Sequence, residues 1–163
     1  MMTMKLRPPR HRIQRRAIGW WVTRGLCLLL PLAGVPALLF GFWEASRPWT
    51  GPLLVVILVL GLLHAAVVPG WRYAVHRWEV TEEAVYASSG WFVRQWRIAP
   101  ISRIQTVDTT RGPLEQLMGL ATLVVTTASS SGAVSIHGLT PEDAAEAADR
   151  LTELTRRTPG DAT

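Results

Sequence analysis

The sequence predicts an α+β membrane protein, in which two transmembrane α-helices precede an antiparallel β-barrel or sandwich capped by a C-terminal α-helix. Two stretches of nineteen residues, 25–43 and 51–69, contain no Asp, Glu, Lys or Arg. Short β-type runs broken by turn residues follow them, and one amphipathic helical pattern ends the chain. The length of 163 residues leaves room for a helical hairpin and one small domain, but not for two sizeable cores.

Each uncharged stretch is long enough to cross the hydrocarbon core of a bilayer as a helix. Nineteen residues that rise about 1.5 Å each span about 28 Å. A cleaved signal peptide is not expected, because Trp43 stands where the cleavage site needs a small residue. We therefore expect a hairpin joined by the loop 44–50. Five Trp residues lie at the expected membrane–water interfaces: Trp20, Trp21, Trp43, Trp49 and Trp71.

The net charge of +5 would suit a nucleic-acid-binding protein, but the charge is concentrated at one end. Seven basic and no acidic residues precede residue 25, whereas nine Arg and eleven acidic residues follow residue 70. Nucleic-acid binding is therefore not expected, and the basic arm places both termini in the cytoplasm. The arm residues expected to set this topology and to contact anionic lipid are Arg10, Arg12, Arg15, Arg16 and Arg24.

Small residues at four-residue spacing indicate close helix packing inside the membrane. We favour the interpretation that these residues let the two helices of the hairpin pack on each other. The alternative is that they let the hairpin pack on a partner subunit. His64 is expected to form a hydrogen bond across the hairpin, since neither stretch holds an acidic partner for it. The small residues are Ala33, Ala37 and Gly41 in the first stretch and Gly61 and Ala65 in the second.

The region after the hairpin predicts six strands and one helix. The strands are expected at 72–80, 84–88, 91–98, 104–110, 120–128 and 133–137, with a bulge inside the first and a hairpin turn at 129–132. Residues 113–119 are expected to form a single helical turn. Thr140 and Pro141 suit the start of the last helix. The domains expected are a basic arm at 1–24, the hairpin at 25–70, the cytoplasmic domain at 71–157 and a flexible tail at 158–163.

Several motifs in this region resemble the bacterial pleckstrin-homology-like membrane proteins of the YdbS type. They are WEVT at 78–81, Gly90 with Arg94, IAPISRIQ at 98–105, RGPLEQLMGLATL at 111–123 and TTA at 126–128. The resemblance covers residues 71–154, and the preceding hairpin matches the same architecture. Ser129 departs from it, because such domains often have Gly after the Thr-Ala. The resemblance implies a pleckstrin-homology barrel on the cytoplasmic side of the bacterial inner membrane, without an agreed ligand or catalytic activity.

No set of residues indicates an enzyme. No nucleophile elbow surrounds any Ser, and no Gly-rich phosphate loop occurs. His76 and His137 are not at a metal-ligand spacing, and the single Cys excludes a multi-cysteine zinc site. We therefore expect no catalytic residue, no metal and no cofactor.

With an enzyme not expected, we interpret the domain as one that binds a partner. Trp91 and Trp96 have opposite parity in one expected strand, so only one of them readily enters the core. The outer Trp, with Phe92 or Val93, is expected to contact a partner membrane protein or a second copy, or else to cover an edge of the core. Lipid binding is less favoured, because Glu82 and Glu83 repel anionic headgroups and Arg94 and Arg97 are expected on opposite faces of the strand. The residues expected to contact a partner or lipid are Trp91, Phe92, Arg94, Trp96, Arg97, Arg103 and Arg111.

The function predicted is therefore a non-catalytic membrane-anchored scaffold or assembly subunit. The alternative is a sensor of lipids at the membrane surface, and the third candidate is an accessory subunit of a membrane enzyme or transporter.

Overall fold

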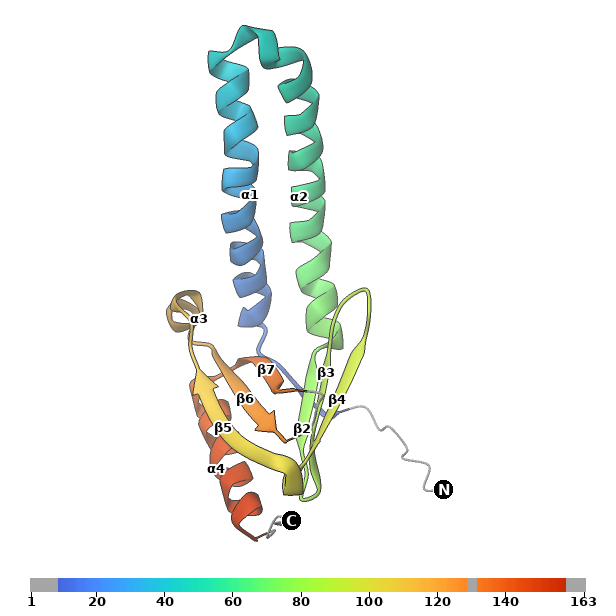
Figure 1. Ribbon diagram of the computed structural model, residues 1–163, viewed down its shortest axis with the longest axis vertical. Helices are drawn as coiled ribbons and strands as arrows, with labels where there is room; N and C mark the ends of the chain where they lie inside the picture. Colours follow the sequence, from blue (N-terminus) through green and yellow to red (C-terminus); the bar gives the residue numbers. More distant parts are fainter. Residues whose placement is uncertain (1–8, 129–131, 158–163) are drawn as a thin grey trace. The chain divides into compact units, whose positions relative to one another are not determined.

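A computed structural model of the protein describes residues 9–128 and 132–157 (Figure 1). The chain divides into two compact units, which are described separately. One is a helical hairpin, Ile18–Trp71, and the other combines Met1–Ala17 with Arg72–Thr163. The element order confirms the predicted fold class of two long apolar helices, antiparallel strands and a C-terminal helix. Residues 129–131 of the expected turn at 129–132 and the expected tail at 158–163 lie outside the described residues.

The hairpin consists of helix α1, Arg16–Phe42, and helix α2, Arg47–Val75. Both are long and apolar enough to cross a membrane. They extend beyond the uncharged stretches, because the polar residues that flank an apolar segment continue its backbone hydrogen bonds. The connection is shorter than the predicted loop, since a 3-10 turn, Glu44–Ser46, leads directly into α2.

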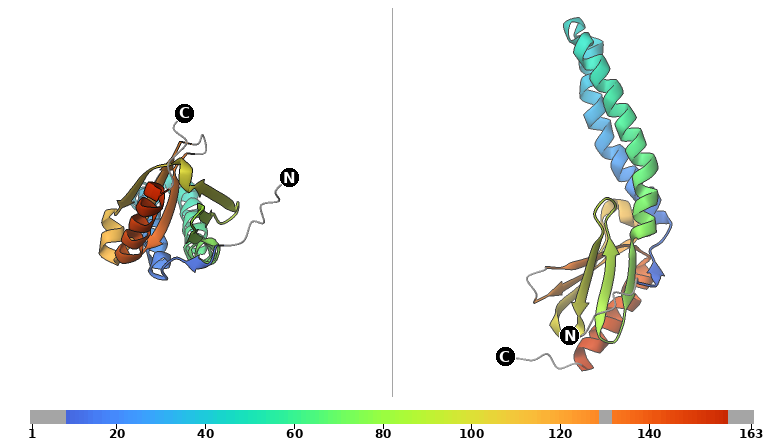
Figure 2. Two further views of the ribbon diagram at one scale, coloured as in Figure 1. Left: turned by 90° about the horizontal axis from the view of Figure 1, so that it is seen from below. Right: turned by 90° about the vertical axis from the view of Figure 1, so that its right-hand side faces the viewer.

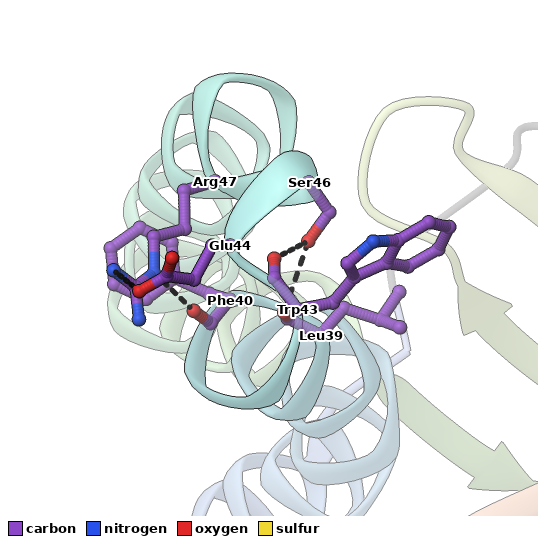
Figure 3. A network of polar contacts seen from close by, with 6 residues as sticks. All are labelled: Leu39, Phe40, Trp43, Glu44, Ser46 and Arg47. Carbon is purple, nitrogen blue, oxygen red and sulfur yellow. Dashed lines mark hydrogen bonds and ion pairs between the residues drawn. The ribbon is translucent and has the colours of Figure 1, made fainter.

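Side chains of this connection bind the carbonyl groups that α1 leaves at its end (Figure 3). The Ser46 hydroxyl lies 3.0 Å from the Leu39 carbonyl oxygen and 2.7 Å from that of Trp43. Arg47 donates from Nε to the Phe40 carbonyl at 3.1 Å and pairs with Glu44 at 3.3 Å. These contacts supply the partners that the last turn of a helix lacks, and they close the hairpin tightly.

The small residues of the hairpin occupy different surroundings. A Cβ built at Gly61 would overlap the Leu29 side chain, so α1 and α2 approach closely there. Ala33 and Ala37 line an apolar groove of about 510 Å³ between residues of both helices. Around Gly41, the described part of the chain places nothing within 4 Å of such a Cβ. Ala65 is half-buried.

The second unit contains two antiparallel sheets that form a sandwich rather than a closed barrel (Figure 2). The first sheet has the order β1-β2-β3-β4: β1 His11–Arg12, β2 Arg77–Val80, β3 Ala84–Ser89 and β4 Gln95–Pro100. The second has the order β5-β6-β7: β5 Ile104–Thr110, β6 Ala121–Thr127 and β7 Val134–Leu139. A 3-10 turn, Ile101–Arg103, joins the sheets, and a short helix α3, Pro113–Met118, joins β5 to β6.

The C-terminal helix α4, Pro141–Arg157, lies against β5 and β6 and completes the core (Figure 2). The Thr140 hydroxyl accepts a hydrogen bond from the backbone N–H of Asp143 at 3.0 Å, so Thr140 caps the helix as the sequence predicts. The buried side of α4 consists of Ala144, Ala147 and Leu151. They join residues from both sheets in one apolar cluster, which holds the sandwich together.

Three segments differ from the sequence prediction. The expected strand at 72–80 is instead the end of a helix followed by a strand, because α2 continues to Val75 and β2 starts at Arg77. The change of apolar parity within 72–80 therefore marks the boundary between helix and strand, and not a bulge. The basic arm is partly folded, since His11 pairs with Trp78 and Arg12 with Arg77. The third strand covers 95–100 and not 91–98, so residues 91–94 belong to a loop.

Candidate functional site

The loop between β3 and β4, residues 90–94, exposes three consecutive large apolar side chains. Trp91 is 45% exposed, Phe92 86% and Val93 65%. The loop needs Gly90, whose φ of +111° lies in a region that L side chains rarely adopt. It extends beyond the ends of the neighbouring strands (Figure 1). Adjacent exposed apolar residues on a projecting loop indicate a contact surface for a membrane or a protein.

A cavity of about 480 Å³ lies beside this loop. It forms where the inward face of the β3–β4 hairpin changes from apolar to polar. Val85, Ala87 and Ala99 belong to the core, and the same face continues toward the loop as Ser89 on β3 and Gln95 and Arg97 on β4. The other walls come from the end of α2, from the loop and from β7. The complete lining is Arg72, His76, Ala87, Ser89, Gly90, Trp91, Phe92, Val93, Gln95, Arg97, Ala133, Ser135 and His137.

The ionisable residues that line the cavity are all basic or imidazole groups. Arg72 and His76 come from the end of α2 and the residue after it, Arg97 from β4 and His137 from β7. No Asp or Glu lines the cavity in the described structure. Arg97 also donates from Nη1 to the Ala133 carbonyl at 2.7 Å, which ties β4 to the start of β7. The cavity is therefore electropositive and suits an anionic group.

His76 lines this cavity and is buried. Its Nδ1 lies 2.7 Å from the Arg72 carbonyl oxygen, and because that oxygen only accepts, Nδ1 carries the hydrogen. Burial lowers the pKa of His76 below its ordinary value, and the charges of Arg72 and His137 lower it further, although the hydrogen bond to Arg72 opposes this shift. Burial is therefore the main cause of the lowered pKa of His76, and the neighbouring charges add to it.

A chain of hydrogen bonds, buried at its centre, orients His137. Glu115, on α3, accepts from the Thr122 hydroxyl at 2.7 Å and from the Gly112 backbone N–H at 2.8 Å. Since Thr122 gives its only hydroxyl hydrogen to Glu115, its oxygen accepts from Nδ1 of His137 at 3.0 Å. The Glu115 carboxylate therefore orients the His137 ring through Thr122.

Acidification is expected to destabilise the sandwich through His76. Because its folded-state pKa is lowered, the unfolded chain takes up this proton at higher pH. The contribution is complete above the ordinary value of 6.5 and is lost as the pH falls below it toward the lowered folded-state pKa. The charges of Arg72 and His137 both disfavour the protonated form of His76.

Thermal unfolding at about pH 7.5 and about pH 5.5 checks this expectation. The His76→Gln variant should lose less stability on acidification than the parent protein, whereas His11→Gln, which changes an exposed ring, should behave like the parent. An equal loss in all three proteins would contradict the role given to His76.

The structure brings some of the sequence-predicted contact residues together and separates others. Trp91, Phe92 and Arg97 line the cavity, and Arg94 lies in the same loop. Trp96 is 41% exposed in β4, next to the loop. Arg103 lies in the 3-10 turn at the other end of β4, and Arg111 donates from Nε to the Leu120 carbonyl at 3.1 Å.

The prediction that Arg94 and Arg97 lie on opposite faces of one strand is wrong, because Arg94 precedes β4. Trp91 also precedes β4, whereas Trp96 lies within it, so these two residues are not on opposite faces of one strand. Arg10, Arg12, Arg15, Arg16 and Arg24 are exposed. His64 is exposed as well, and its bond across the hairpin stays a prediction.

Sequence reasoning missed Arg72, His76, Gln95, Ser135 and His137 as neighbours in one cavity. For Gln95 the available signal was a polar residue at an inward strand position, where a core strand has an apolar one. The separation along the chain hid their proximity. Within the described residues, no group of three or more His, Cys, Asp or Glu is placed to hold a metal ion.

An apolar two-helix hairpin joined to a two-sheet sandwich with a C-terminal capping helix defines a membrane-anchored pleckstrin-homology-like module. The family model for the bacterial PH domain matches residues 27–155, and the chain belongs to this family. The chain is similar to the UPF0699 transmembrane protein YdbS of Bacillus subtilis (strain 168), with 30% identity over 159 residues, 94% of this chain and 97% of that protein. No solved structure matches the chain.

Proposed function

We propose that this protein is a non-catalytic module that contacts the lipid surface of the membrane in which its hairpin is anchored. The β3–β4 loop enters the headgroup region, and the cavity beside it faces the headgroups. The observation that carries this proposal is the exposure of Trp91, Phe92 and Val93 on a loop that borders a cavity lined by Arg72. Arg72 directly follows Trp71, the last residue of the hairpin unit, so the covalent chain keeps this wall of the cavity close to the bilayer.

The lipid surface explains this site better than a scaffold that contacts other proteins. Glu82 and Glu83 precede β3, whereas the cavity lies at the end of β3, about 20 Å away along a strand of six residues. These two carboxylates therefore do not repel a headgroup in the cavity. Aromatic side chains beside basic ones suit a membrane interface, where rings lie among headgroups and cations contact anionic lipid.

Cysteine labelling tests the orientation on which this proposal depends. The basic arm predicts that both termini, and with them the sandwich, are cytoplasmic. In a Cys27→Ala background, an Ala45→Cys variant should react with a membrane-impermeant maleimide added to intact cells. A Ser102→Cys variant, at an exposed position of the sandwich, should react only after lysis. The reverse pattern would contradict the orientation.

Photo-crosslinking in native membranes tests the contact itself. A photoreactive p-benzoylphenylalanine in place of Phe92 should form adducts with the mass of phospholipids. The same residue in place of Glu82, which is also exposed, serves as the matched control and should form few lipid adducts. A defined protein adduct from position 92 without lipid adducts would replace the lipid-surface function by the scaffold function.

A further inference from the structure

We propose that the cavity beside the β3–β4 loop binds a phosphate group, with Arg72, His76, Arg97 and His137 around it. The phosphate belongs to a phospholipid headgroup or is a free phosphate anion, and the chemistry of recognition is the same. This inference rests on the proposed function, in which the cavity faces the headgroups.

The four side chains come from three separate segments of the chain. The end of α2 supplies Arg72 and His76, β4 supplies Arg97 and β7 supplies His137. Surface cations usually lie apart or beside carboxylates, but here two guanidinium groups and two imidazole rings share one cavity without a lining carboxylate in the described residues. Guanidinium and imidazole groups gathered around one cavity create a positive potential there, which favours an anionic ligand.

Phosphate fits this set of donors. The planar guanidinium group binds phosphate oxygens with two parallel hydrogen bonds, and two of the lining groups are guanidinium groups. Ser89, Ser135 and Gln95 add neutral hydrogen-bonding groups to the wall. No tetrahedral or octahedral metal site competes for the cavity, since the lining residues include no carboxylate ligand and only two imidazoles.

The size and the apolar wall of the cavity indicate that the phosphate carries a larger group. The volume of about 480 Å³ lies within the range of about 300–1,000 Å³ that is usual for small-molecule sites. Trp91, Phe92 and Val93 form the wall on the loop side. A ligand with a phosphate at one end and apolar chains at the other, as in a glycerophospholipid, matches both parts of the lining.

The hydrogen-bonded chain from Glu115 through Thr122 makes His137 a positioned donor. Its ring is fixed through Nδ1, so Nε2 is the nitrogen left for an anion, to which it donates in the imidazolium form. Burial is the main cause of the lowered pKa of His76, and the charges of Arg72 and His137 lower it further, so a phosphate bound beside the ring should raise this pKa.

The experiment uses the full chain in nanodiscs of phosphatidylcholine and follows the four imidazole rings by NMR during pH titration. In one arm, inorganic phosphate is added; in the other, the nanodisc contains phosphatidic acid. Phosphate bound in the cavity should raise the pKa of His76 and shift His137, and should leave His11 and His64 unchanged. A response to inorganic phosphate identifies a free-anion site, and a response to phosphatidic acid alone identifies the lipid headgroup as the source.

Matched variants separate the cavity from general electrostatic attraction. Arg97→Gln should weaken phosphate binding about tenfold or more, because a charge-assisted contact is lost. Arg72→Gln should have a similar effect and leaves the bond from Arg97 to Ala133 intact. Arg103→Gln removes an exposed charge outside the cavity and should change binding less than about twofold.

The absence of any His76 or His137 response in both arms would overturn the phosphate site, as would equal weakening by Arg97→Gln and Arg103→Gln. This failure is distinct from failure of the proposed function. Lipid adducts at position 92 without a histidine response would keep the membrane contact and remove the phosphate site. A histidine response to inorganic phosphate without lipid adducts would keep the site and remove the membrane contact.

Discussion

The Leu151→Ala variant is expected to lose about 2–5 kcal/mol of unfolding free energy in the sandwich unit. Leu151 lies on the inner side of α4, is 0% exposed and belongs to the apolar cluster shared by both sheets. Truncation removes buried apolar contacts and leaves a cavity that the surrounding strands fill only in part. Urea unfolding in detergent micelles, followed by Trp fluorescence, measures the change.

Leu117→Ala is the matched control for this variant. The Leu117 side chain, on α3, is 83% exposed, so its truncation should change the unfolding free energy by no more than about 0.5 kcal/mol. Equal effects of the two substitutions would contradict the placement of α4 on the core.

The Gly90→Val variant is expected to displace the β3–β4 loop while the sandwich core stays folded. The observed loop needs a φ of +111° at this position, and a Cβ there would overlap the backbone carbonyl of Val93. A side chain in this region of φ costs about 1–3 kcal/mol, which reduces the population of the observed loop about fivefold or more. Lipid adducts formed from the photoreactive residue at position 92 should fall by a similar factor.

Gly70→Ala is the control for this second variant. Gly70 lies within α2 without a positive φ, and the described residues leave open space for its Cβ. This change should leave the lipid adducts at position 92 unaltered. Unchanged adduct yield in Gly90→Val would contradict the requirement for the observed loop conformation.

Local patterns in the sequence account for the elements that were predicted well. The two uncharged stretches fix the hairpin, because apolar length alone decides whether a helix can cross a bilayer. The cap at Thr140 and the apolar spacing of Ala144, Ala147 and Leu151 likewise define α4. The alternation of Val134 and Ile136 predicts the inward face of β7.

Segments that depend on distant contacts were predicted less well. Residues His11 and Arg12 form a strand only because β2 offers them an edge more than sixty positions later in the chain. The aromatic and β-branched residues at 91–93 have strand propensity, but the positive φ of Gly90 starts a loop there. The cavity combines residues of α2, β4 and β7, so no spacing along the chain could indicate it.

The depth of the β3–β4 loop in the bilayer tests the central claim most directly. A Phe92→Cys variant in a Cys27→Ala background, labelled with an environment-sensitive fluorophore, is placed in nanodiscs that contain nitroxide-labelled lipids. Our account predicts strong quenching by nitroxides near the headgroups and weak quenching by a water-soluble quencher. The label on a Glu82→Cys variant should show the opposite preference. Equal quenching of the two labels by the water-soluble agent, without lipid quenching at position 92, would contradict contact between this loop and the membrane.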